Sequence, residues 1–190
     1  DDVYHLKGWL EDGLEIFDTY PNVGAVTGFY IKQRVGMSSD QTLEWIKAYE
    51  AANPGKVERG QLIPAKWEEE FKSNSGRDEA RYQSEIAGLE DVVVDYQGVK
   101  AFVSAHHFQM MLPKKVLVEI LSEMLEAGWS DQLMGRMVEF DDRMDAKGYL
   151  RLTTYRQTMR LLGNVIDEEV AALAKADGLE TEAAREAKPK

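Results

Sequence analysis

Residues 9–31 read WLEDGLEIFDTYPNVGAVTGFYI, a helical pattern followed closely by a strand pattern. The first part places apolar side chains at positions 9, 10, 14 and 17, the spacing of an amphipathic helix, and Pro21 ends it. The part from Val23 to Ile31 is rich in β-branched and aromatic residues, which is typical of a buried strand. A helix that leads directly into such a strand predicts an α/β fold.

The same alternation returns in the second half of the chain. Strands are predicted near 92–96, 99–111 and 149–154. Helices are predicted near 114–127, 131–147 and 167–176. Residues 32–90 are polar and amphipathic, and we interpret them as a helical insertion over one face of the domain. The sequence thus predicts one domain over 1–176 with this insertion, followed by a charged flexible tail over 177–190.

The amino-acid composition excludes several classes of function and partner. The chain has 190 residues, of which 44% are hydrophobic, so it should fold. A net charge of -11 makes nucleic acid a poor partner, because an acidic surface repels phosphate backbones. The absence of cysteine excludes disulfides and thiolate chemistry, and it fits a cytoplasmic location. No apolar run approaches the roughly 20 residues of a membrane-spanning helix, so no transmembrane segment is expected.

Several short motifs follow one another along the chain in an order that indicates a family resemblance. The first half contains DDVY at 1–4, GWL at 8–10 and PNVGAVTG at 21–28. The second half contains HFQMM at 107–111, PKKVL at 113–117, DRMDAKGYLRL at 142–152 and GN at 163–164. Together they resemble the family 2 glycosyltransferases of the GT-A fold, from the acidic metal-binding motif onward. The resemblance covers roughly 1–31 and 99–165 but not the insertion.

This resemblance implies a partial GT-A-type (Rossmann-like) mixed sheet flanked by helices. It also implies an enzyme that transfers a sugar from a nucleotide-sugar donor to a hydroxyl acceptor, with inversion as the expected stereochemical outcome. Because the chain starts with Asp1 rather than Met, we expect it to be the C-terminal portion of the domain. Its partner would then be the N-terminal half of that same domain.

The cofactor-binding residues follow from the same resemblance. Asp1 and Asp2 would face the donor diphosphate, and Asp2 would be a ligand of Mg²⁺ or Mn²⁺, cations that prefer oxygen ligands. Arg151 would contact a donor phosphate, with Arg156 as a second candidate. The alternative for the two aspartates is an acidic chain terminus without a role, and for the arginines it is an ordinary surface cation.

Two acids are candidates for the general base that takes the proton from the acceptor hydroxyl. Asp131 precedes a predicted helix, whose dipole would keep the carboxylate ionised. If the family motif is aligned with a shift along this helix, Glu139 is the general base instead. The alternative is that these are solvated helix acids, some of which pair with Arg136 or Arg143.

The acceptor would be bound by His107 and Trp129. A structural role is the alternative for His107. Further aromatic candidates for stacking on a sugar ring are Trp45, Trp67 and Tyr155, although Trp45 and Trp67 fall on apolar helix faces, where core packing is the default.

A second hypothesis belongs to another class of protein. The family often has a metal-ligating histidine where this chain has Leu162, and a Glu-Asp pair where it has Arg136 and Met137. These departures favour a non-catalytic α/β interaction module, a degenerate transferase domain that binds a protein partner through 32–90.

Overall fold

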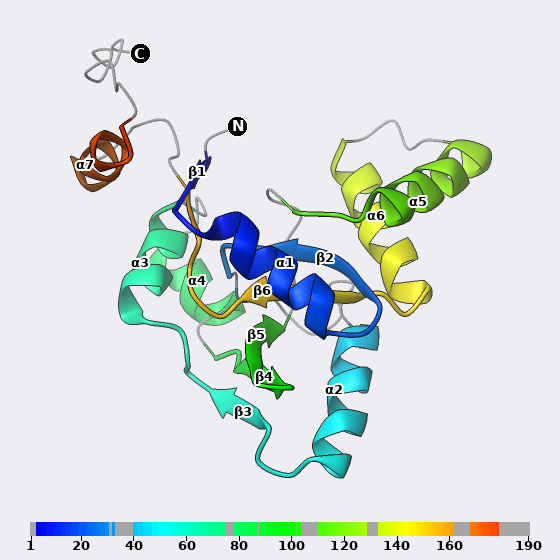
Figure 1. The fold of residues 1–190 in the computed structure, drawn as a ribbon. Helices are drawn as coiled ribbons and strands as arrows, with labels where there is room; N and C mark the ends of the chain where they lie inside the picture. The colour runs from blue at the N-terminus through cyan, green and yellow to red at the C-terminus, as the bar shows by residue number, and fades with distance from the viewer. Residues whose placement is uncertain are drawn as a thin grey trace.

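The structure is a computed structural model and describes residues 3–30, 32, 40–74, 78–86, 88–103, 110–128, 133–161 and 168–178. Over these residues the chain forms an α/β fold, in which helices flank a mixed five-stranded sheet (Figure 1). The fold class predicted from sequence is therefore confirmed.

The strands form two sheets. They are β1 (Val3–His5), β2 (Val23–Thr27), β3 (Val57–Gly60), β4 (Asp91–Tyr96), β5 (Val99–Val103), β6 (Leu150–Thr154) and β7 (Met159–Leu161). The main sheet has the order β2-β6-β5-β4-β3; β2 and β6 are parallel, and the other neighbours are antiparallel. Strands β1 and β7 form a separate antiparallel pair.

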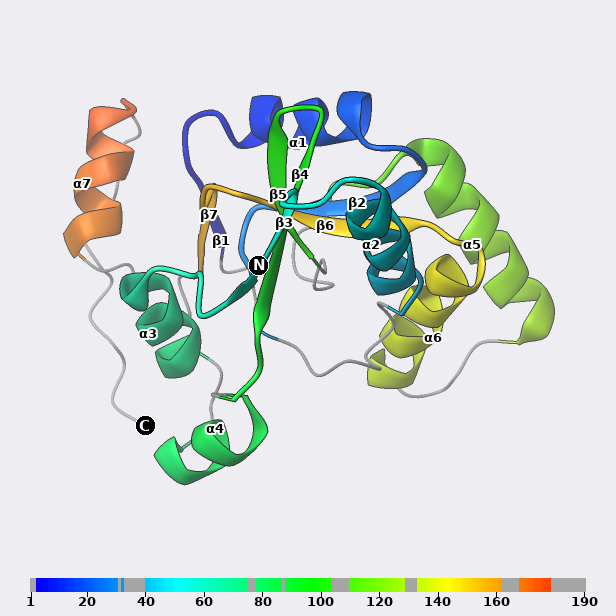
Figure 2. The same ribbon diagram turned by 90° about the horizontal axis from the view of Figure 1, so that it is seen from below.

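Helices cover both faces of the main sheet. They are α1 (Trp9–Thr19), α2 (Asp40–Ala52), α3 (Ala65–Asn74), α4 (Glu79–Glu85), α5 (Lys114–Ala127), α6 (Leu133–Ala146) and α7 (Glu168–Ala176). Figure 2 shows α1 along one side of the sheet and α3 with α4 on the other. Helices α5 and α6 pack against each other, and their shared core includes Ala25 of β2.

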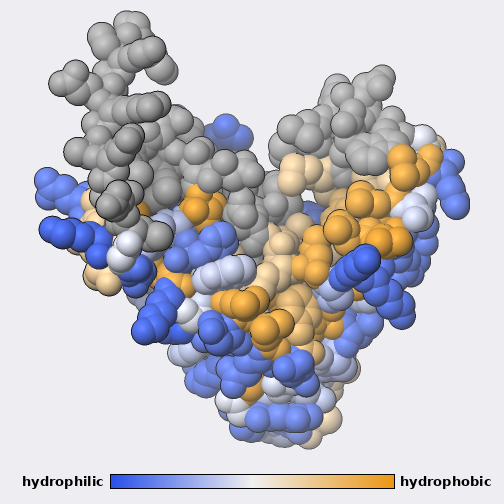
Figure 3. Space-filling view, turned by 45° about the horizontal axis from the view of Figure 1, so that its top comes forward, coloured by the Kyte–Doolittle hydropathy of each residue, from blue (hydrophilic) through white to orange (hydrophobic). Residues whose placement is uncertain are grey.

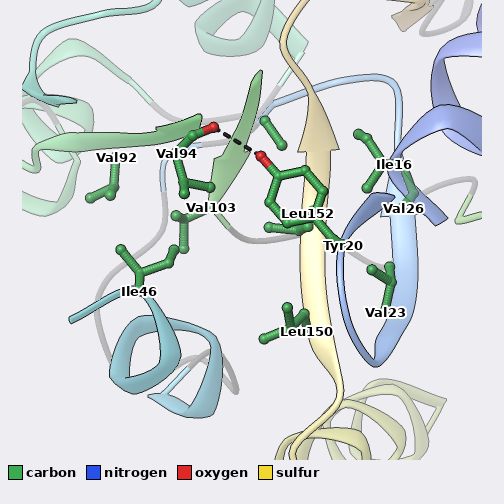
Figure 4. Packing of buried hydrophobic residues seen from close by; sticks show 11 residues of the cluster. Ile16, Tyr20, Val23, Val26, Ile46, Val92, Val94, Val103, Leu150 and Leu152 are labelled. Carbon is green, nitrogen blue, oxygen red and sulfur yellow. Dashed lines mark hydrogen bonds between the residues drawn. The ribbon is translucent and has the colours of Figure 1, made fainter. Parts of the chain in front are cut away.

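The largest core lies between α1, α2 and the sheet (Figure 4). The Tyr20 side chain enters this core, and its hydroxyl donates to the carbonyl oxygens of Val94 (2.9 Å) and Val99 (2.7 Å). Ile46 of α2 and Leu152 of β6 are fully buried beside it. The alternation of side chains along each strand produces this face, since every second residue points toward the same helices.

Aromatic residues fill much of both faces. On the second face Phe102 stacks on Tyr30, with ring centroids 4.5 Å apart, and Trp67 of α3 packs against Phe102. On the first face Trp45 stacks on Tyr49, with centroids 5.4 Å apart. Trp45 and Trp67 are thus partly buried and pack against the core, as their positions on apolar helix faces indicated.

The insertion differs from its sequence prediction. We predicted helices alone over 32–90, but the segment also supplies β3, which pairs with β4 at the edge of the sheet. Strand β3 reads VERG, too short and too polar for a strand pattern to be recognised. The backbone hydrogen bonds of β4 decide its conformation instead.

Two predicted strands are shorter than expected. Strand β2 ends at Thr27 instead of Ile31, because the next carbonyl, that of Gly28, accepts from the amides of Thr158 and Met159. Strand β5 ends at Val103, and residues 104–109 lie outside the described part of the chain. Met111 makes an isolated antiparallel bridge with Val26 on the open edge of β2.

Gly28 has no room for a side chain. A Cβ atom there would lie 2.1 Å from Thr158 Oγ1 and 2.8 Å from Met159 Cγ. We expect Gly28→Ala to lower the free energy of unfolding by about 1–3 kcal/mol, the usual cost of overpacking, in urea denaturation. Gly88→Ala is the control, because nothing lies within 4 Å of a Cβ at that position. Equal stability of the two variants would contradict the prediction.

Candidate functional site

Two segments far apart in sequence meet in the β1–β7 pair. Val3 is opposite Leu161, Tyr4 opposite Arg160 and His5 opposite Met159. Strand β1 directly follows the acidic residues Asp1-Asp2, and β7 directly precedes the closing motif of Leu162-Gly163-Asn164. The residues that follow the acidic pair and those that precede the closing motif thus lie on neighbouring strands.

This pair lies at the carboxyl ends of the parallel strands β2 and β6. Gly28, which follows β2, accepts from the amide of Thr158 at 2.8 Å, and Thr158 accepts from the amide of Leu6 at 2.9 Å. We call the region formed by Val3–Leu6, Gly28 and Thr158–Leu161 the β1–β7 junction. In open α/β sheets ligands bind outside the carboxyl ends of the strands, so this is where a ligand is expected.

A pocket of about 290 Å³ opens between α1, β5 and the end of β6. We call it the Tyr155 pocket. It is lined by Asp12, Glu15, Ile16, Gly98, Val99, Lys100, Thr154, Tyr155 and Arg156. Tyr155 and Arg156 were singled out in the sequence as candidates for stacking and phosphate contact, whereas the other lining residues carried no signal.

Arg156 lies at the edge of the pocket, between α1 and Gly8. Its Nε donates to Asp12 Oδ2 at 2.8 Å, and its Nη2 donates to Asp12 Oδ1 at 3.0 Å. These bonds hold the pKa of Arg156 above its usual range. The guanidinium also lies over Gly8, where a Cβ atom would be 2.5 Å from Nη2. The bidentate pair and the glycine together fix the orientation of this cation at the edge of the pocket.

Tyr155 is half exposed, yet its ring is held in place. It stacks on Phe102 with ring centroids 5.7 Å apart, and Lys100 Nζ lies 5.3 Å from its centroid. Lys100 in turn donates to Glu58 Oε1 at 2.7 Å, which raises the pKa of the lysine. Because Phe102 packs on the α3 face of the sheet, the Tyr155 ring lies on that face as well, across the sheet from α1.

Most of the site residues predicted from sequence lie outside the described part of the chain. They are Asp1, Asp2, His107, Trp129 and Asp131. Their roles stay predictions. The structure describes Glu139 and Arg151, together with the further candidates Trp45, Trp67, Tyr155 and Arg156.

Arg151 requires a correction. Its side chain is 1% exposed, and Nη2 lies 3.0 Å from Asp141 Oδ2 inside the domain. Its backbone amide donates to Thr42 Oγ1 at 3.1 Å. Burial lowers the pKa of Arg151, while Asp141 opposes that shift. The enclosed guanidinium links β6 to α6. The sequence resemblance implied that Arg151 contacts a donor phosphate, but in this position the side chain is not accessible to one.

Glu139 pairs with Arg143, four residues later on α6. Arg143 donates to Glu139 Oε1 from both Nε (3.0 Å) and Nη2 (2.7 Å), and its Nη1 lies 3.6 Å from Glu123 Oε2 on α5. This is the ion-paired alternative considered for the acids of this helix. The contact links α5 and α6, so Glu139 has a structural function.

Sequence reasoning missed a buried charge cluster beneath the insertion. Lys32 and Asp91 both have fully buried side chains, and Lys32 Nζ lies 3.9 Å from Asp91 Oδ1 and 3.4 Å from Glu68 Oε1. Asp91 Oδ2 accepts from the backbone amides of Leu62 (2.7 Å) and Ile63 (3.0 Å). The cluster anchors the segment between β3 and α3 to β4. In the sequence Asp91 directly precedes the apolar residues 92–94. An acid at the start of a buried strand was the one feature that could have indicated this cluster.

No group of three or more metal-ligating side chains occurs among the described residues, which do not include Asp1 and Asp2. In that same part of the chain no helix is long and apolar enough to cross a membrane. Comparisons with models of known families, with curated proteins and with solved structures find no match.

Proposed function

We propose that this chain is part of a nucleotide-sugar-dependent glycosyltransferase that carries out an inverting transfer to a hydroxyl acceptor. The observation that supports it is the β1–β7 pair. The strand after the acidic pair and the strand before the closing motif lie side by side at the carboxyl ends of β2 and β6. A transferase needs these two motifs together at one donor site, although about 160 residues separate them in the chain.

The proposal assigns the donor end of the site to the acidic pair. Aspartate oxygens are the ligands that Mg²⁺ and Mn²⁺ prefer, so the donor set of Asp1 and Asp2 fits such a cation. When bound, the cation would supply positive charge against the diphosphate leaving group. Asp131 would take the proton of the acceptor hydroxyl. Arg151 has no part in this site, because it is buried against Asp141.

Donor binding tests the proposal directly. Calorimetry of the full-length protein with Mn²⁺ and a panel of UDP-, GDP- and TDP-sugars should identify one donor that binds only with the cation. Asp2→Asn should lower that affinity by roughly tenfold or more, since even the loss of a residue supporting a metal ligand costs that much. Asp18→Asn, an exposed acid on α1, is the matched control and should bind normally. Absence of binding to every donor would contradict the proposal.

One observation favours the second candidate, an interaction module. Large apolar side chains are exposed on two of the helices, with Leu10 and Leu14 on α1 and Val118 and Leu125 on α5. Figure 3 shows apolar surface gathered over the middle of one face of the molecule and toward its upper right. Exposed apolar patches on a folded domain are common at protein–protein interfaces. A protein that binds no donor but associates through this face would be the module.

A further inference from the structure

We propose that two copies of this chain associate through the outer side of α5, as an antiparallel helix pair related by a two-fold axis. The surface consists of Lys115, Val118, Leu121, Leu125 and Glu126, and we call it the α5 stripe. The inference does not depend on the proposed transferase activity, because it uses only the apolar residues and the charges of one helix.

Helix α5 has apolar residues on two sides. Its inner side contributes Val116, Ile120 and Met124 to the core that it shares with α6. Its outer side carries Val118 and Leu125, whose exposed fractions are 53% and 61%. A surface helix of a globular protein ordinarily has one apolar side and one polar side. The outer side of α5 is therefore more apolar than the fold of a single copy requires.

The outer apolar residues form a continuous row along the helix. Val118, Leu121 and Leu125 follow the i, i+3, i+7 spacing, which is the spacing of a helix that packs against a second helix. Leu121 also packs partly against the core and fills the row between the two exposed residues. Figure 2 shows α5 as the outermost helix on this side of the molecule, with α6 between it and α2. A second helix can therefore approach the row.

The charges beside this row indicate which partner fits. Lys115 and Glu126 lie about three helical turns apart, so both flank the same edge of the row. Both are exposed, and neither forms an ion pair within the described part of the chain. The acids nearer to α6, Glu119 and Glu123, are instead paired with Lys147. The α5 stripe thus has an unpaired base near its start and an unpaired acid near its end.

This order of charges is unfavourable in a single helix. The helix dipole favours acids in the first turn and bases in the last turn, and α5 has neither. The stability of the isolated helix therefore does not explain why Lys115 stands at one end and Glu126 at the other. A neighbouring helix that runs in the opposite direction would place an acid beside the base and a base beside the acid.

A second copy of α5 supplies that neighbour. In a two-fold symmetric pair the same surface of each copy faces the other. Val118 of one copy then packs beside Leu125 of the second, and the two Leu121 side chains meet near the axis. Lys115 of each copy lies beside Glu126 of the other. A parallel pair would instead bring like charges together, which costs free energy.

Sedimentation equilibrium of the full-length protein measures the association. A pair of helices this short buries a small interface, so we expect a dimer with a Kd of about 10–100 µM. Leu125→Glu should weaken the dimer by about tenfold or more, because it places a charge in the apolar row. Leu14→Glu is the matched control, since Leu14 is 48% exposed on α1 and should leave the dimer unchanged. Circular dichroism verifies that both variants fold.

Charge reversal tests the antiparallel arrangement. Lys115→Glu alone and Glu126→Lys alone should each weaken the dimer about five- to tenfold at low salt, because two like-charge contacts replace two ion pairs. An equimolar mixture of the two variants should associate as tightly as the parent chain. Each contact between the two different copies then again joins a base to an acid.

Four results would overturn the proposal. They are a monomer at every concentration up to about 500 µM, a dimer that Leu125→Glu leaves unchanged, a dimer that Leu14→Glu disrupts equally, and a mixture of the charge variants that associates no more tightly than either variant alone.

Discussion

Asp131→Asn is expected to lower turnover by about two to four orders of magnitude while donor binding stays nearly unchanged. A positioned general base contributes that much to a rate, and an amide of the same shape cannot accept the acceptor's proton. In the sequence Asp131 comes two residues before Leu133, the first residue described in α6, and a carboxylate at a helix N-terminus is favoured by the helix dipole. The measurement is turnover of the full-length protein with the donor found by calorimetry, together with the donor affinity of the variant.

Glu139→Gln is the matched control. The structure places this carboxylate in an ion pair with Arg143 that also reaches α5, so the variant should retain activity and lose a little stability. An inactive Glu139→Gln beside a normal Asp131→Asn would transfer the role of general base to Glu139. Full activity of both variants would exclude the inverting mechanism proposed for this chain.

Asp91→Ala is expected to lower the free energy of unfolding by about 3–5 kcal/mol, the usual cost of removing one partner from a buried ion pair. The substitution leaves the enclosed Lys32 ammonium without its fully buried counter-ion. It also removes the hydrogen-bond acceptor of the backbone amides of Leu62 and Ile63, which lie between β3 and α3. Urea denaturation followed by circular dichroism measures the change.

Two further variants identify the cause of that loss. Asp91→Asn keeps an oxygen acceptor for the two amides and removes only the charge, so its stability should fall between those of the parent and Asp91→Ala. Glu50→Gln breaks the exposed pair with Arg59 and should cost at most about 1 kcal/mol. A cost for Asp91→Ala no larger than that of Glu50→Gln would show that the Lys32 cluster does not stabilise the insertion.

The helices and buried strands followed from the sequence because their signals are local. The helix predicted near 114–127 is α5 (Lys114–Ala127), and the one predicted near 131–147 is described as α6 (Leu133–Ala146). The strand predicted near 149–154 is β6 (Leu150–Thr154). Periodic apolar residues, with proline and glycine at the ends, contain enough information to set an element's type and the α/β class of the fold.

The candidate site was less predictable, because charged residues look alike in sequence whether they are buried or exposed. Arg151 and Arg156 lie five residues apart on one segment, yet the first is enclosed against Asp141 and the second is held at a pocket edge by Asp12. Their partners come from α6 and α1, and no local pattern contains that information. Motif order suggested what the chain does, while the tertiary structure decided which arginine is accessible to a ligand.

The sequence by itself determined an α/β chain with a large polar insertion and an acidic, cysteine-free composition. Only the tertiary structure decided that Val3 pairs with Leu161, that β3 extends the sheet, and that Lys32 and Asp91 are buried together. The physical reason is the range of the interactions. Periodicity and turn chemistry act over a few residues, whereas strand pairing and burial of charge depend on segments that meet only when the whole chain has folded.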